Sequence, residues 1–230
     1  MNTYWIILIG TAIAGWLVQW NLNRKFEKYS KIALRNGMTG KDVAEMMLRE
    51  NGISDVRVVA SSGILTDNYN PTNHTISLSE GVYGSYSVTA AAVAAHETGH
   101  AIQHAKAYAP LKMRSALVPV ISFSSQWVTW IILGGLLLMG NGRGIGSSLL
   151  LIGILLYAAI TLFSLITLPV EIDASRRALA WLSQAGITDS STYGPAKVAL
   201  KSAAYTYVVA ALSALATLFY YISIFLGRRQ

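Results

Sequence analysis

The chain has 230 residues, of which 53% are hydrophobic and only 13% are charged. The charged share is about half of that in soluble domains, so the composition argues against an ordinary soluble enzyme and favours a membrane protein. The absence of cysteine excludes disulfides and thiolate metal ligands. The formal net charge is +7, but the basic residues flank apolar runs and form no continuous stripe with interleaved aromatic residues. No nucleic acid is therefore expected as a partner.

The first predicted element is an uncharged apolar run over residues 4–20, at the short end of what can cross a bilayer. A cleaved signal peptide is the alternative. However, no Lys or Arg precedes the run, and a basic cluster from Arg24 to Arg35 follows it. This order predicts a retained membrane anchor with a basic segment beside the membrane.

A small polar segment follows the anchor. Residues 38–52 predict a short helix with one apolar side, in which Thr39 caps the start and Asp42 stands at the capping-box distance. Strands are predicted over 56–60 and 75–79, with turn-forming residues between them. The second strand either pairs with an extended peptide substrate along its edge or is purely structural, and the sequence leaves both open.

Residues 90–103 predict one helix, because Ala, Val and Ile fill it, no proline interrupts it and hydroxyl residues precede it as N-caps. The helix contains the motif His-Glu-x-x-His, whose four-residue step places His96 and His100 on one face. Two imidazoles so arranged can bind one Zn²⁺, with Glu97 as general base toward a water activated by the metal. A chance pairing is the alternative, but two of only four histidines stand at this spacing around a glutamate.

Three further apolar spans follow the motif, over residues 116–140, 145–170 and 203–226. Each is longer than the roughly 18 residues that mark a candidate transmembrane helix. The short turn at 141–144 makes the first two of them an antiparallel hairpin. The predicted fold is therefore a mainly α-helical integral membrane protein. We expect one domain over residues 1–230, with about four transmembrane helices and a small cytoplasmic α+β segment that carries the motif helix.

The distribution of positive charge predicts the orientation. Four spans place the segments 21–115 and 171–202 on one side, and together these carry 15 of the 18 Lys and Arg residues. Arg143, Arg228 and Arg229 fall on the other side. Because basic residues accumulate on the cytoplasmic side, the two segments are predicted to be cytoplasmic. The sequence thus predicts a multi-pass protein of the cell membrane with its motif helix at the cytoplasmic surface.

A zinc peptidase site of this kind needs a third protein ligand. His104 stands eight residues after His96, which is about 12 Å along an unbroken helix and too far to share the metal. His74 is a weak alternative from another segment. Glu171 lies where the third span leaves the bilayer, on the side already assigned to the motif helix. A carboxylate there is costly without a partner such as a metal, although Glu171 and the arginines after it could also be interfacial charges.

These residues resemble a known family. The run His96–His104, the strand before it and Glu171–Ser175 after it are similar to the YugP-type family of bacterial neutral zinc metallopeptidases. Residues 201–208 are similar to a downstream segment of that family, so that the resemblance covers nearly the whole chain. The layout resembles more distantly the HtpX-type and CAAX-protease membrane peptidases, which follow His-Glu-x-x-His with a later Glu-x-x-x-Asp.

The resemblance implies a zinc-dependent, gluzincin-like metalloendopeptidase. It implies that Zn²⁺ is held by His96, His100 and Glu171 and that Glu97 is catalytic. Where the distant relatives carry Asp four residues after the ligand Glu, this chain has Ser175. The partner of a ligand imidazole is therefore left open between Ser175 and Asp173. Tyr207, within the downstream segment, is either an oxyanion donor or an interfacial aromatic residue.

The predicted function is hydrolysis of peptide bonds in protein or peptide substrates at the cytoplasmic membrane surface. The expected partners are the lipid bilayer and a peptide or membrane-protein substrate. No Lys or Arg stands between Arg57 and Lys106, so a peptide fits this segment better than an anionic phosphoester. The alternatives are a zinc-binding membrane scaffold without proteolytic activity and a metal-ion carrier. A binding-only site has no need of Glu97, and the spans lack acidic residues except beside Glu171.

Overall fold

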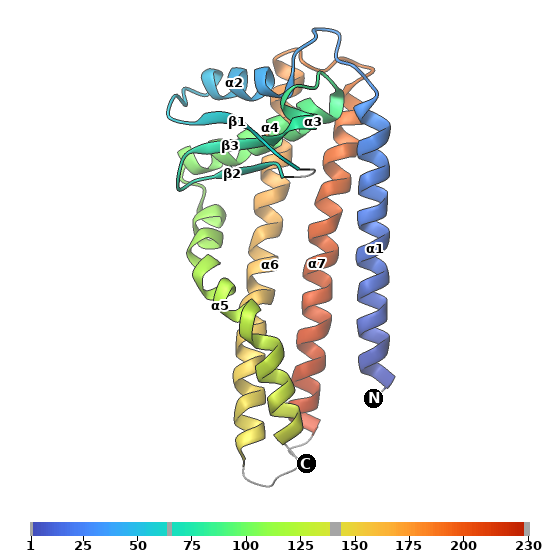
Figure 1. The fold of residues 1–230 in the computed structure, drawn as a ribbon, viewed down its shortest axis with the longest axis vertical. Coiled ribbons are helices and arrows are strands. Elements are labelled where there is room, and N and C mark those ends of the chain that lie inside the picture. Colours follow the sequence, from blue (N-terminus) through green and yellow to red (C-terminus); the bar gives the residue numbers. More distant parts are fainter. Residues whose placement is uncertain (1, 64–65, 139–143, 228–230) are drawn as a thin grey trace. The chain divides into compact units, whose positions relative to one another are not determined.

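The computed structural model describes residues 2–63, 66–138 and 144–227 of the chain. These residues are mainly helical, and four of the helices are long and apolar enough to cross a membrane, as predicted. The four are α1 (Asn2–Ser30), α5 (Ala109–Leu138), α6 (Ile145–Gln184) and α7 (Tyr193–Gly227) (Figure 1). Each extends beyond the apolar run that predicted it. Residues 139–140 of the predicted second span, most of the 141–144 turn, and Arg143, Arg228 and Arg229 lie outside the described residues.

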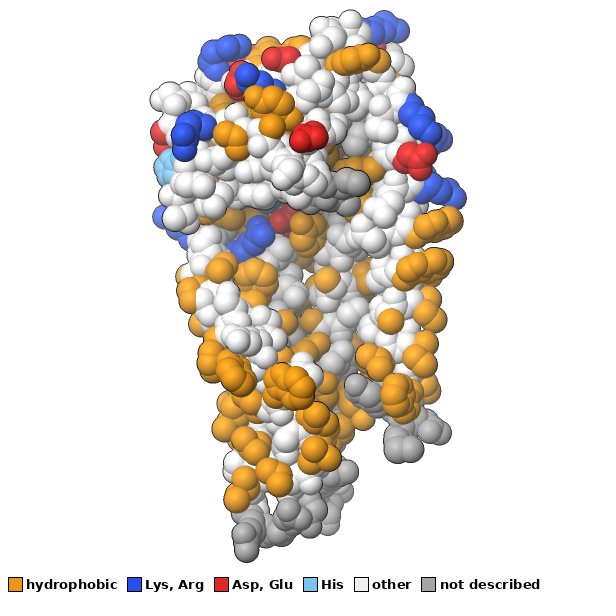
Figure 2. Space-filling view, in the orientation of Figure 1, with side chains coloured by type: hydrophobic (Ala, Val, Ile, Leu, Met, Phe, Trp, Pro, Cys, Tyr) orange, Lys and Arg blue, Asp and Glu red, His pale blue; other side chains and the backbone are white. Residues whose placement is uncertain are grey.

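The long helices expose large apolar side chains. Four of them, one from α1, two from α5 and one from α7, are between 65% and 72% exposed: Ile6, Trp130, Leu137 and Phe219. Figure 2 shows hydrophobic side chains along α1 and α5, whereas charged side chains gather over α2, the sheet and the upper end of α1. Extended apolar surface of this kind is rare on soluble monomers and is typical of lipid contact.

The chain forms two compact units. One contains most of α5, the first part of α6, the last part of α7 and the first half of α1. In this unit a Cβ on Gly135 would lie 2.7 Å from Leu150 N, and a Cβ on Gly153 would lie 2.5 Å from a side-chain carbon of Ile132. The later residue of α5, Gly135, is close to the earlier residue of α6, Leu150, whereas the earlier Ile132 is close to the later Gly153. The two helices are therefore antiparallel, as the predicted hairpin requires.

The other unit comprises Leu17–Lys112 and Pro169–Thr206. Its three-stranded sheet has the order β1-β3-β2. The strands are β1 (Arg57–Ser61), β2 (Asn68–Asn70) and β3 (Thr75–Ser79). Strand β3 pairs in parallel with β1 and antiparallel with β2. Of the two alternatives that the sequence left open for the 75–79 strand, the structure favours the structural one, since β1 and β2 pair with its two edges. Strand β2, within the predicted turn segment, was not anticipated.

Three helices pack with the sheet in this unit, namely α2 (Gly40–Glu50), α3 (Glu80–Tyr83) and α4 (Val88–Ala105). Helix α2 begins with the predicted capping box, in which the Thr39 side chain accepts from Asp42 N and the Asp42 side chain accepts from Thr39 N. Ser87 is the N-cap of α4, and its hydroxyl accepts from Ala90 N at 3.2 Å. All the alanines of α4 except Ala105 are buried, in contact with α2, the sheet and α6. Their small side chains let the neighbouring elements approach closely.

Candidate metal centre

The site lies where α4 and α6 come together, and Gly99 permits that approach. A Cβ on Gly99 would lie 2.8 Å from the carbonyl oxygen of Ala174 on α6, closer than side-chain carbons approach backbone. Gly99 stands between His96 and His100 on α4, and Ala174 follows Glu171 by about one turn of α6. The glycine therefore brings the two histidines within reach of the glutamate.

Replacing Gly99 by alanine should destabilise the protein and weaken metal binding. The methyl group would meet backbone, which cannot move aside as a flexible side chain can, and such over-packing costs about 1–3 kcal/mol. The melting temperature of the detergent-solubilised protein measures the loss. Gly194 on α7 is the matched control, because a Cβ there meets nothing within 4 Å. Gly194→Ala should therefore leave the melting temperature close to that of the unsubstituted protein. Equal melting temperatures for the two variants would contradict the packing role.

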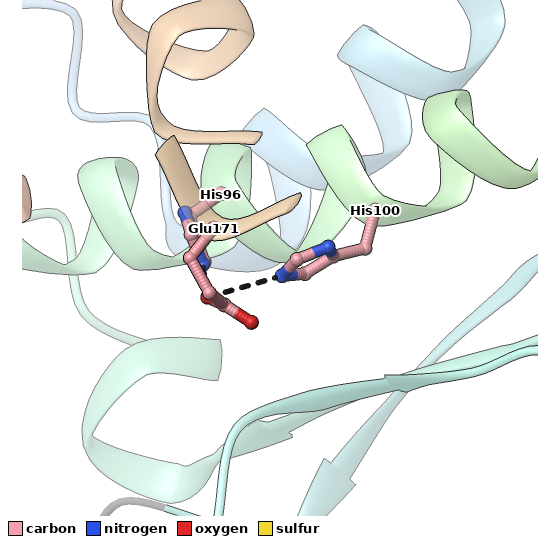
Figure 3. Close-up of side chains that lie close together, drawn as sticks. All are labelled: His96, His100 and Glu171. Carbon is pink, nitrogen blue, oxygen red and sulfur yellow. Dashed lines mark hydrogen bonds and ion pairs between the residues drawn. The ribbon is translucent and has the colours of Figure 1, made fainter. Parts of the chain in front are cut away.

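Three predicted ligands converge in this place. His96 Nε2 lies 3.2 Å and His100 Nε2 lies 3.5 Å from Glu171 Oε2. In Figure 3 the histidines extend from α4 and the glutamate from α6 toward a common point. The side chains of His96, His100 and Glu171 are 13%, 9% and 3% exposed. A carboxylate buried to this degree needs close partners, and the two imidazoles provide them.

The spacing of the three side chains fits a tetrahedral ion. Zinc–nitrogen and zinc–oxygen bonds of about 2.0–2.1 Å at tetrahedral angles place neighbouring ligand atoms roughly 3.3 Å apart. The histidine–glutamate distances of 3.2 and 3.5 Å bracket that value, and the candidate ligand atoms of all three residues lie within 4.8 Å of one another. Within the described ranges this is the one group of three or more such residues that could hold a metal ion. Three protein ligands would leave one position open for water or substrate, as catalytic zinc sites do.

The electrostatics of the site favour a positive charge. Burial lowers the pKa of His100, but its hydrogen bond with Glu171 and the charges of Glu171 and Glu97 raise it more. The pKa of His100 therefore lies above its ordinary value. The negative charge that stabilises a proton on this imidazole would also stabilise a divalent cation between the three side chains. The field thus agrees with the geometry in favouring a cation at this point.

Both ligand imidazoles have partners on their far nitrogens. Ser175 Oγ lies 3.1 Å from His96 Nδ1, so Ser175, one of the two partners that the sequence left open, contacts a candidate ligand directly. Asp173 reaches the other imidazole through Gln103, whose Oε1 lies 3.0 Å from His100 Nδ1. The sequence interpretation missed Gln103. The signal that could have revealed it is its position three residues after His100, on the same face of α4.

The remaining predicted residues lie elsewhere. His104 Nδ1 lies 2.9 Å from the Tyr69 hydroxyl, and His74 Nδ1 lies 2.6 Å from Asp55 Oδ2. Neither histidine joins the group of His96, His100 and Glu171, as the length of the helix predicts for His104. The two arginines that follow Glu171, at positions 176 and 177, both pair with Asp173.

Two further predicted residues are not assigned a role by the geometry. Glu97 is half-buried on α4, between the two histidines in sequence, and its charge raises the pKa of His100. Its catalytic role stays a prediction. Tyr207 belongs to the other compact unit, so its role as an oxyanion donor also stays a prediction.

Comparison with known proteins agrees with this arrangement. A profile of the family described as "putative neutral zinc metallopeptidase" matches residues 4–226. Over 212 residues the chain is 41% identical to the "putative membrane protease YugP" of Bacillus subtilis (strain 168), a match that covers 92% of this chain and 92% of the relative. No solved structure matches the chain. Because the profile covers nearly the whole length, the chain belongs to the neutral zinc metallopeptidase family.

Proposed function

We propose that the protein is a membrane-embedded zinc metalloendopeptidase that hydrolyses peptide bonds of protein or peptide substrates at the cytoplasmic membrane surface. The observation that carries the proposal is the convergence of His96 and His100 from α4 with Glu171 from α6. Glu97 on the same turn of α4 supplies the acid–base group that hydrolysis needs. A family of zinc metallopeptidases and a relative named as a membrane protease support the same assignment.

The residues divide the work of hydrolysis among them. His96, His100 and Glu171 would hold Zn²⁺, with the partners of both imidazoles fixing the ring orientations. When bound, the ion supplies Lewis acidity that polarises the scissile carbonyl and makes a water more acidic. Glu97 takes the proton of the attacking water and later delivers it to the leaving amine. One water is consumed, and the products are a carboxylate and an amine.

Removing the metal should abolish cleavage, and returning zinc should restore it. The test uses the full chain in detergent with an unfolded protein as substrate, and follows fragments by mass. Chelation should stop fragment formation, whereas stoichiometric zinc should bring it back. Protein that contains one zinc per chain and yet cleaves no unfolded substrate would overturn the peptidase assignment and leave a zinc-binding membrane scaffold.

The proposed orientation places the metal centre on the cytoplasmic side, because segments 21–115 and 171–202 carry most of the Lys and Arg residues. The chain contains no cysteine, so single cysteines can be introduced without background. In intact cells a membrane-impermeant maleimide should label Asn141→Cys in the predicted outer turn and should not label Glu80→Cys. Permeabilised cells should label both. The reverse pattern in intact cells would contradict the orientation while leaving the metal centre unaffected.

A further inference from the structure

Gln103 is fully buried and makes three hydrogen bonds between α4 and α6. Its Nε2 donates to the carbonyl oxygen of Val170 at 2.8 Å and to Asp173 Oδ2 at 3.0 Å. Its Oε1 faces His100 Nδ1 at 3.0 Å. An amide offers two donor hydrogens on nitrogen and only acceptor sites on oxygen. The side chain thus uses both donors on one side and its acceptor on the other.

These partners allow only one orientation of the amide. A backbone carbonyl and a carboxylate only accept hydrogen bonds, so the nitrogen of Gln103 must face Val170 and Asp173. The oxygen of Gln103 must then face His100. Because that oxygen also only accepts, a neutral His100 that keeps this hydrogen bond carries its hydrogen on Nδ1. Its Nε2 then has a lone pair that can bind a metal. Glu171 Oε2 lies 3.5 Å from that nitrogen, so without a cation between them the carboxylate competes with Gln103 for the hydrogen.

We propose that Gln103 is a positioning residue that fixes His100 in the Nδ1–H tautomer and holds its Nε2 toward the metal. The inference rests on the metal centre of the proposed function. Carboxylates and backbone carbonyls commonly accept from the outer nitrogen of a ligand histidine, and here a side-chain amide takes their place. Through the amide, Asp173 helps to orient the ring of His100, while its own charged carboxylate does not contact the ring.

The amide is itself held in place. Asp173, with a side chain only 6% exposed, receives the Gln103 amide hydrogen and pairs with Arg176 and Arg177. Val170 belongs to the backbone of α6, one residue before Glu171. Gln103 therefore fixes the position of His100 on α4 relative to α6, the helix that supplies the third ligand. If the amide of Gln103 flipped, its oxygen would face two acceptors, the carbonyl oxygen of Val170 and Asp173 Oδ2. The amide therefore cannot easily turn its nitrogen toward His100 to accommodate the other tautomer.

The other ligand lacks such a determinant. Ser175 Oγ lies 3.1 Å from His96 Nδ1, and a hydroxyl can either donate or accept. This contact is compatible with both tautomers of His96. Ser175→Ala therefore provides a matched control, because it removes one hydrogen-bonding partner from the opposite ligand imidazole without touching Gln103.

The tautomer can be measured directly, because the chain has only four histidines. Full-length metal-free Glu171→Ala protein lacks the competing carboxylate and is labelled with ¹⁵N-histidine in detergent with neutral imidazoles. It should show His100 with its hydrogen on Nδ1, and His100→Asn assigns the signal. Adding Gln103→Met, which keeps the length but not the acceptor, should make the Nε2–H form appear, and Gln103→Met alone should weaken the zinc Kd about 10–100-fold. Ser175→Ala should leave the His100 tautomer unchanged.

An Nε2–H tautomer of His100 in the metal-free Glu171→Ala protein would overturn the inference, even if Gln103→Met failed to fold. The same holds for a folded Gln103→Met protein that keeps both the Nδ1–H form and the original zinc Kd. Neither readout needs catalysis. Unsubstituted protein that binds zinc with His100 as Nδ1–H but cleaves nothing would end the peptidase proposal and leave the role of Gln103 standing.

Discussion

Replacing Glu97 by glutamine should lower kcat for peptide cleavage by about 10²–10⁴-fold, the usual contribution of a positioned acid–base group. The amide has nearly the same size and polarity as the carboxylate, but it cannot take a proton from water. Zinc content should stay unchanged, because Glu97 is not part of the three-residue group that could hold the ion. Steady-state cleavage and metal analysis of the same preparation measure both quantities.

Glu80→Gln is the control for the Glu97 substitution. Glu80 is an exposed carboxylate on α3, so its replacement should change neither cleavage nor zinc content. A Glu97→Gln protein that cleaves at the unsubstituted rate would remove Glu97 from the mechanism. Loss of zinc from Glu97→Gln would instead make Glu97 part of the ligand set and would contradict the assignment of roles.

Replacing Glu171 by alanine should weaken zinc binding by more than about 100-fold, beyond the 10–100-fold typical of losing an outer-shell partner. Glu171 is the one member of the group that comes from α6, and its side chain is only 3% exposed. Without it, two histidines on one helix are left to hold the ion. A competition titration against a chelator of known affinity measures the change.

Glu171→Gln separates the loss of a ligand from the loss of packing. Glutamine fills nearly the same volume, but its neutral amide oxygen is a poorer zinc ligand than a carboxylate. We expect this variant to keep a melting temperature close to that of the metal-free unsubstituted protein and still to bind zinc weakly. Unchanged zinc affinity in both Glu171 variants would remove Glu171 from the site.

Much of the fold could be predicted from local pattern. Long uncharged runs predict the four long helices, because length and apolar composition are sufficient signals for a membrane-spanning segment. The capping box at Thr39 and Asp42 predicts the start of α2, because the contact is formed within one turn. The alanine-rich run predicts α4 for the same reason: its helix is favoured by residues within the segment itself.

Features that depend on pairing between distant segments could not be predicted. Strand β2 has only three residues, in a segment rich in turn formers, and it forms because β3 lies beside it. The central place of β3 also follows from tertiary pairing, so no local pattern excludes a free edge. The predicted third span ends at residue 170, yet α6 continues to Gln184. Ala174, Ala178 and Leu182 are fully buried at helical spacing there, but polar neighbours obscure the pattern.

The metal centre shows the same division. His96 and His100 are marked by their spacing on one helix, whereas Glu171 was found by counting membrane spans between distant segments and by the resemblance to a family. The sequence left the outer partner open between Ser175 and Asp173, and the structure gives each a different imidazole. Gln103 was missed because its importance depends on Val170 and Asp173, which approach it only after α4 and α6 have packed.

The most direct test of the proposed peptidase is to sequence the new N-termini that the protein creates. Unfolded protein substrate is incubated with zinc-loaded full-length protein in detergent, and in parallel with zinc-loaded Glu97→Gln. We predict that internal N-termini accumulate with the unsubstituted protein and are absent with Glu97→Gln. The same termini in both reactions, or none with fully zinc-loaded unsubstituted protein, would contradict the account.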